Sequence, residues 1–115
     1  MRLITAIIQP TKLSAVRDAL QNHGVERMTV CDAQGYGRQR GQVASFRGNE
    51  YRVDLLRKVV LEIAVSDDRL ESTIDLIRKT ALTGSEGEIG DGKIFVLPVA
   101  EVIDIAGGRR GPAAV

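Results

Sequence analysis

The spacing of apolar residues changes repeatedly along this chain, and the order of these changes is the strongest restriction on its fold. Residues 3–8 form a short aliphatic run bounded by Pro10, which is typical of a buried strand. From Thr11 the apolar residues recur at helical spacing as far as Gly24, a residue type that often ends helices. The chain is therefore expected to begin with a strand and a helix.

The rest of the chain continues this pattern with an extra strand. We expect strands at 28–33, 59–65 and 93–97, a helix at 66–81, and a short further strand at 102–105. The main order is that of the ferredoxin-like βαββαβ sandwich, an antiparallel sheet with two helices on one face. A chain of 115 residues has the size of one domain, so a single α+β domain is predicted.

Aromatic residues make up only 3% of the chain, and three of them, Tyr36, Phe46 and Tyr51, lie between residues 35 and 54. The core is therefore expected to be aliphatic. The stretch 35–54 has no convincing periodicity, and at about 20 residues it is far longer than an ordinary hairpin loop. Because Tyr and Arg are residues that anchor interfaces, we predict an interaction loop here, with a solvated linker as the alternative.

Composition excludes several classes of protein. Cys31 is the only cysteine and His23 the only histidine, which excludes a disulfide framework, a Cys/His zinc site and a Cys-His nucleophile pair. The net charge of +1 and the absence of aromatics from 3–8 and 59–65 argue against nucleic-acid binding. With no leader-like N-terminus and no long apolar run, the sequence predicts a cytoplasmic protein without membrane insertion.

A second glycine-rich stretch, residues 83–93, partly matches a phosphate-binding loop. Gly87 is followed after four residues by Gly92 and Lys93, but Ile94 stands where that motif needs Ser or Thr. The expected context also runs from helix to strand, so we reject the nucleotide-hydrolase interpretation. Closely spaced glycines still allow backbone N–H groups to surround an anion, with Lys93 adding charge.

Short motifs give a more specific indication. GYGRQRG at 35–41, FRGNEY at 46–51 followed by Val53-Asp54, and IGDGKIFV at 89–96 resemble the PII signal-transduction family in order and spacing. The resemblance covers nearly the whole chain. It implies a cytoplasmic homotrimer that binds ATP or ADP in clefts between subunits and senses 2-oxoglutarate. A long T-loop between strands 2 and 3, here about 37–55, would control target enzymes, transporters or regulators.

The resemblance also implies roles for individual residues. Gln39 would ligate Mg²⁺ alongside 2-oxoglutarate, Lys58 would pair with the carboxylate of 2-oxoglutarate, and Tyr51 occupies the position that is uridylylated in many bacterial members. As an alternative, Tyr51 is a docking side chain only. The nucleotide contacts implied by the resemblance are Gly37, Arg38 and Gln39 at the loop base, Thr29 and Ala64 on the adenine side, and Gly90, Asp91, Gly92 and Lys93 in a phosphate-side loop at about 83–92.

Two departures from the family pattern bear on phosphate binding. The phosphate-side loop is lengthened by Ser85-Glu86-Gly87-Glu88, and Asp104 and Ala106 stand where many members have arginines. Each lost charge-assisted hydrogen bond costs about 1.5 to 3 kcal/mol, so weaker triphosphate binding is expected. We hypothesise that Arg109 and Arg110, in the tail at about 107–115, fold back and replace the missing arginines.

The leading functional prediction is a non-enzymatic regulator of nitrogen metabolism. Its expected targets are proteins such as an ammonium transporter, a nitrogen-metabolism enzyme or a uridylyltransferase. The alternative is a PII-like regulator of carbon or bicarbonate status that binds ADP or AMP with altered effector specificity. A hydrolase of the acylphosphatase type would need a catalytic amide and an arginine at the end of the first strand, and nothing there resembles them.

Overall fold

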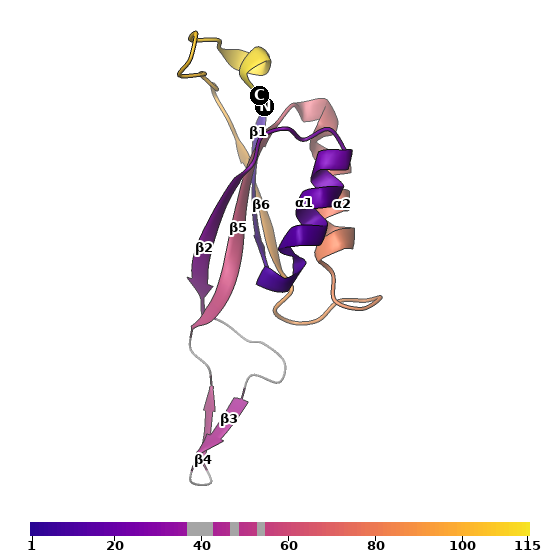
Figure 1. The fold of residues 1–115 in the computed structure, drawn as a ribbon, viewed down its shortest axis with the longest axis vertical. Helices are drawn as coiled ribbons and strands as arrows, with labels where there is room; N and C mark the ends of the chain where they lie inside the picture. Colours follow the sequence, from indigo (N-terminus) through magenta and orange to yellow (C-terminus); the bar gives the residue numbers. More distant parts are fainter. Residues whose placement is uncertain (37–42, 47–48, 53–54) are drawn as a thin grey trace.

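The computed structural model describes residues 1–36, 43–46, 49–52 and 55–115. Its frame is a four-stranded sheet with the order β2-β5-β1-β6, in which every neighbouring pair is antiparallel. Two helices, α1 and α2, lie side by side on one face of this sheet (Figure 1). This arrangement confirms the predicted ferredoxin-like fold. The bounds are β1 Arg2–Ile8, α1 Leu13–Asn22, β2 Thr29–Gly35, β5 Leu56–Val65, α2 Leu70–Ala81 and β6 Gly92–Pro98.

The helices begin and end close to the predicted positions. Gly24, with a φ of 92°, follows the C-cap of α1 and adopts the left-handed conformation that the sequence predicts for a helix stop. The second helix was expected from Ser66, but a 3-10 turn, η2 (Asp67–Arg69), precedes α2, and the Ser66 side chain makes no capping hydrogen bond. Instead, the carboxylate of Asp67 accepts a hydrogen bond of 2.9 Å from the N-terminal amine.

Every second side chain along β1 and β5 faces the helices, and these side chains form the core between the sheet and the helices. Ile4 and Ile8 on β1 and Leu61 and Ile63 on β5 are almost completely buried against the helices. Burying one such side chain contributes about 1.5 to 3 kcal/mol. The buried cluster is aliphatic, as predicted: Ile4, Ala6, Ile8, Val16, Leu20, Val59, Leu61, Ile63, Val65, Ile77 and Ala81.

The opposite face of the sheet stays open in a single chain. Register places Phe95 and Leu97 of β6 opposite Thr5 and Leu3 of β1, on the side away from the helices. The two β6 residues are 48% and 46% exposed, which is unusual for large apolar side chains that share one face.

The long connection between β2 and β5 differs from its prediction. Both strands extend further than expected, pairing as far as Gly35 and Leu56. Part of the supposedly aperiodic stretch forms a two-stranded hairpin, β3 (Val43–Phe46) with β4 (Asn49–Arg52), which lies beyond the ends of β2 and β5 (Figure 1).

The C-terminal segment, residues 101–115, folds back on itself. The strand expected at 102–105 is wrong: only an isolated bridge joins Ile103 to Arg110. The N–H of Asp104 donates to the Arg109 carbonyl at 2.8 Å, so these residues pair within their own turn rather than with the sheet. A 3-10 turn, η3 (Gly111–Ala114), ends the segment, and Ala114 is only 4% exposed.

Candidate functional site

The residues predicted on the adenine side meet at one end of the sheet. Thr29 of β2 and Ala64 of β5 line the same depression, which has a volume of about 290 Å³. Register places Ala64 opposite Leu3, and Thr29 opposite Glu62, on the face away from the helices. We call this the Thr29 depression, and its lining residues are Leu3, Arg27, Met28, Thr29, Glu62 and Ala64.

The residues predicted on the phosphate side form an ordered loop at the other end of the sheet. Asp91 holds this loop together, because one carboxylate oxygen accepts hydrogen bonds from the backbone N–H groups of Thr83 at 3.0 Å and Glu88 at 2.9 Å. The other oxygen accepts from the Thr83 hydroxyl and from the Gln9 amide. Burial opposes ionisation, but these hydrogen bonds hold the pKa of Asp91 below its ordinary value. In this structure Asp91 therefore organises the loop from within.

Two lysines bring positive charge to this end of the sheet. The Nζ of Lys58 donates a hydrogen bond of 2.8 Å to the Gly90 carbonyl, tying the start of β5 to the loop. Lys93 lies opposite Ile7 in the β1–β6 register, whereas Ile8 next to it points into the core. Lys58 and Lys93 therefore both lie on the face away from the helices, and the family resemblance implies that they contact the effector carboxylate and the nucleotide phosphates.

The backbone conformation and the close packing at position 92 require glycine. Its φ is 121°, and a Cβ there would lie 1.8 Å from the carbonyl oxygen of Ile7. Gly87, with a φ of 85°, has a milder restriction, since its Cβ would lie 2.7 Å from the Leu82 side chain. Gly92 and Gly87 are thus needed for the fold of this loop, whatever they contribute to a ligand.

The two groups of predicted residues lie far apart within one chain. Lys58 and Ala64 stand at opposite ends of β5, and a strand rises about 3.3 Å per residue, which separates them by about 20 Å. In the described part of one chain, these two groups of predicted site residues therefore do not meet. We call them the two half-sites of the predicted site. Gly37, Arg38 and Gln39 lie outside the described residues, as does the side chain of Tyr51, whose backbone belongs to β4.

The tail arginines take part in ion pairs of the C-terminal segment. The Nε and Nη2 of Arg109 lie 3.0 and 2.9 Å from Oδ2 of Asp104, and the Nε of Arg110 lies 2.9 Å from a carboxylate oxygen of Glu101. Arg109 therefore does fold back, but onto the acid that stands in place of an arginine. The contact of Arg109 and Arg110 with phosphate stays a prediction.

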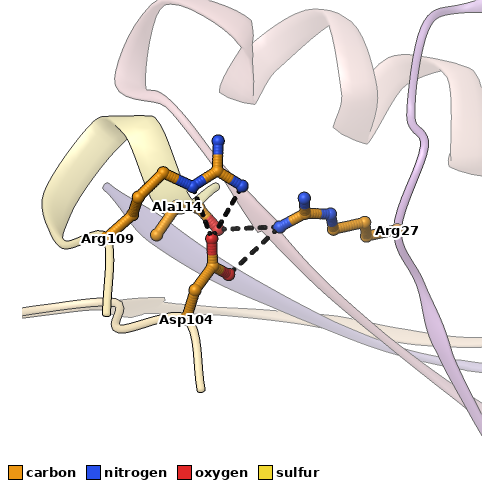
Figure 2. A network of polar contacts seen from close by, with 4 residues as sticks. All are labelled: Arg27, Asp104, Arg109 and Ala114. Carbon is orange, nitrogen blue, oxygen red and sulfur yellow. Dashed lines mark hydrogen bonds and ion pairs between the residues drawn. The ribbon is translucent and has the colours of Figure 1, made fainter. Parts of the chain in front are cut away.

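Sequence reasoning missed Arg27. Its Nη1 lies 3.2 Å from Oδ1 of Asp104 and donates to the Ala114 carbonyl at 3.4 Å, so two guanidinium groups converge on one carboxylate (Figure 2). We call Arg27, Asp104 and Arg109 the Asp104 network. Nothing local in the sequence indicates this contact, because Arg27 and Asp104 are 77 residues apart in the chain.

Within residues 1–36, 43–46, 49–52 and 55–115, no group of three or more His, Cys, Asp or Glu side chains is arranged to hold a metal ion. No helix in the same ranges has the length and apolar character needed to span a bilayer.

Comparison with known proteins gives a consistent result. Residues 1–109 match the family model described as "Nitrogen regulatory protein P-II". The chain is 45% identical over 115 residues to nitrogen regulatory protein GlnK of Escherichia coli (strain K12), with 100% of both chains covered. With the same full coverage over 115 residues, it is 50% identical to nitrogen regulatory protein P-II of Klebsiella oxytoca. The corresponding value for nitrogen regulatory protein P-II of Mesorhizobium japonicum is 49%.

Proposed function

The chain belongs to the P-II family of nitrogen regulatory signal transducers, and we propose that it binds adenine nucleotide, Mg²⁺ and 2-oxoglutarate between identical chains. The observation that carries this proposal is the separation of the two half-sites. The Thr29 depression and the loop beside Lys58 lie at opposite ends of one sheet. A second copy that presents its loop to the first chain's depression would complete the site.

The resemblance to the family implies a homotrimer, and a contact of this kind is compatible with one. Joining one end of a chain to the other end of its neighbour is a head-to-tail interface, which closes into a ring when the rotation permits. Three such interfaces would give three clefts. The open sheet face, with Phe95 and Leu97 nearly half exposed, supplies apolar surface that association would cover. Each chain would act as one domain spanning residues 1–115.

The described residues at the loop end fit an anionic ligand. Lys58 and Lys93 bring positive charge to one face of the sheet, beside the glycine-containing loop. Lys58 would exchange the Gly90 carbonyl for the far carboxylate of 2-oxoglutarate. Gln39 would contribute a ligand to Mg²⁺, whose chemical part is to bring nucleotide phosphate and effector carboxylate together and neutralise their charge.

We infer that ligand occupancy is read by the T-loop. Effector binding beside Lys58 acts at the start of β5, where the chain leaves that loop, and would favour one of its conformations. A target protein that selects among these conformations is then coupled to the ligand by linkage. This is the action of a non-enzymatic cytoplasmic regulator, with an ammonium transporter, a nitrogen-metabolism enzyme or a uridylyltransferase as its targets.

Tyr51 lies on β4 of this loop and is proposed as the uridylylated position. Mass spectrometry of protein from nitrogen-starved cells tests this: the loop peptide is expected to carry a nucleotide adduct. A peptide that stays unmodified under nitrogen starvation leaves Tyr51 as a docking residue only.

A second candidate, a regulator of carbon status that responds to bicarbonate and binds ADP or AMP, is favoured by the acids near the adenine end. Asp104 and Glu101 add negative charge to the C-terminal segment. Titration calorimetry with the protein saturated in Mg-ATP separates the candidates. If 2-oxoglutarate gives a heat of binding and bicarbonate gives none, the result supports the nitrogen regulator. The reverse result supports the second candidate.

A further inference from the structure

Resting on this proposed function, we propose that Arg27 and Arg109 bind the phosphates of the nucleotide, and that Asp104 holds both guanidinium groups until a phosphate displaces it. Asp104 would thus be an internal competitor of the ligand. It would set how tightly this chain binds nucleotide. Arg27 would thus join the expected phosphate contacts, and Asp104, which stands in the position of an arginine, would have a role of its own.

The Asp104 network contains more positive charge and more hydrogen-bond donors than its one carboxylate can match. The Asp104 side chain is only 18% exposed, whereas Arg27 and Arg109 are 60% and 57% exposed, so the cations face outward around a covered acid. Two guanidinium groups share one carboxylate, which leaves one positive charge and several N–H donors unmatched. Arginine pairs with phosphate through two parallel hydrogen bonds, so a phosphate group satisfies these donors better than one carboxylate does.

Arg27 lies beside the residues predicted to bind the nucleotide. It lines the Thr29 depression together with Thr29 and Ala64, the residues predicted to face adenine. Arg27 and Ala64 also line a neighbouring depression of about 230 Å³, bordered by Arg69 and by the tail residues Pro112 and Val115. The guanidinium group therefore stands at the junction of the proposed nucleotide site and the C-terminal segment.

Only side chains of the Asp104 network have to move for its arginines to reach a ligand. The turn carrying Asp104 is closed by its own backbone, since the Asp104 N–H bonds to the Arg109 carbonyl and the Gly111 N–H bonds to the Val102 carbonyl. Gly107 and Gly108, at the tip of this turn, have open space around them. Rotation of the Arg27 and Arg109 side chains off Asp104 is sufficient to present them to a ligand, with the backbone turn kept intact.

A purely structural role for the network makes a different prediction. If Asp104 and Arg27 only fasten the tail to the body of the chain, then removing either loosens the same contact. Both changes would shift nucleotide affinity in the same direction. If Asp104 competes with phosphate, the two changes shift the affinity in opposite directions.

The test is titration calorimetry of ATP and of ADP with the full-length protein and single variants. Asp104→Asn is expected to bind ATP about tenfold more tightly, and Arg27→Gln and Arg109→Gln about tenfold more weakly. Arg17→Gln is the matched control, because Arg17 is an exposed arginine that pairs with its neighbour Asp18 on α1. Its affinity is expected to match that of the unchanged protein. If Asp104→Asn does not fold, Asp104→Ser removes the same charge.

The outcomes separate this inference from the function on which it rests. If the unchanged protein binds neither ATP nor ADP, the proposed function fails and the inference fails with it. If the unchanged protein binds nucleotide but the Asp104 variant binds no more tightly, only the inference is overturned. The same holds if Arg27→Gln leaves affinity at the level of the Arg17→Gln control.

Discussion

Gly92→Ala is the substitution whose effect the structure defines most sharply. The new Cβ would lie 1.8 Å from the Ile7 carbonyl oxygen and 2.8 Å from its carbon, at a φ of 121°. Both neighbours are backbone atoms of β1, which is a central strand of the sheet. The overlap therefore cannot be relieved by rotating a side chain, so β6 has to shift away from β1. Gly84→Ala is the matched control: its φ is 67°, and nothing lies within 4 Å of the added atom.

The two substitutions share one cost and differ in another. The left-handed backbone costs an L-residue about 1 to 2 kcal/mol at position 84, and at least that much at position 92, whose φ of 121° lies outside the left-handed helical region. At Gly92 the overlap adds about 1 to 3 kcal/mol, or more if the strand pairing breaks. A domain has about 5 to 15 kcal/mol of stability in total, so Gly92→Ala is expected to remove a large fraction of it.

Thermal unfolding followed by circular dichroism measures this difference, with every variant at one protein concentration because association shifts the midpoint. Gly92→Ala is expected to unfold about 10 °C below Gly84→Ala, since 1 kcal/mol corresponds to about 4 to 8 °C in a small domain. Equal midpoints for the two variants would refute the claim that close contact with β1 requires glycine at this position.

Three further substitutions test other parts of the structure. Asp91→Ala is expected to speed amide exchange at Thr83 and Glu88 about tenfold, because both N–H groups lose a charged acceptor; unchanged exchange would contradict the role of Asp91. Since its hydrogen bonds lower the pKa of Asp91, the stabilisation is complete above the ordinary value of about 3.9 and is lost as pH falls further. Thermal unfolding between about pH 5 and about pH 2.5 should therefore show a melting temperature that depends less on pH for Asp91→Ala than for the unchanged protein. Asp67→Asn, at an exposed ion pair with the N-terminus, is expected to leave the melting temperature nearly unchanged, and a large drop would be inconsistent with this. Leu61→Ala should cost about 2 to 5 kcal/mol in urea unfolding, because Leu61 is fully buried; a cost near zero would mean that this part of the core is not packed as described.

The parts of the fold that alternation specifies could be predicted from sequence. Residues 3–8 and 59–65 place aliphatic side chains against the helices at every second position, and this pattern survives in β1 and β5. The sequences of β3 and β4, VASF and NEYR, do not alternate between apolar and polar residues, so they do not predict strands. The apolar residues at 102–105 look like a strand, but Gly107 and Gly108 let the chain reverse and pair within its own turn.

The sequence could name candidate site residues, but it could not show how these residues are arranged in space. Motif resemblance named Thr29 and Lys58, yet their location at opposite ends of the sheet depends on strand register, which a motif does not encode. Arg27 was missed because its partner, Asp104, lies 77 residues away in the chain and meets it only in the folded structure. Asp91 was named as a ligand contact, whereas its described contacts lie inside its own loop and with Gln9.

The measurement that tests the central claim most directly is complementation between two variants. Ala64→Glu blocks the Thr29 depression, and Lys93→Glu reverses the charge at the loop end; homotrimers of either variant are expected to lose ATP binding. If the protein is the proposed ring of three chains, mixed trimers purified through different tags on the two chains would contain one interface at which both half-sites are unchanged. We predict that ATP binding returns in the mixed trimers, with one nucleotide bound per trimer. Mixed trimers that bind no ATP would contradict a site shared between chains.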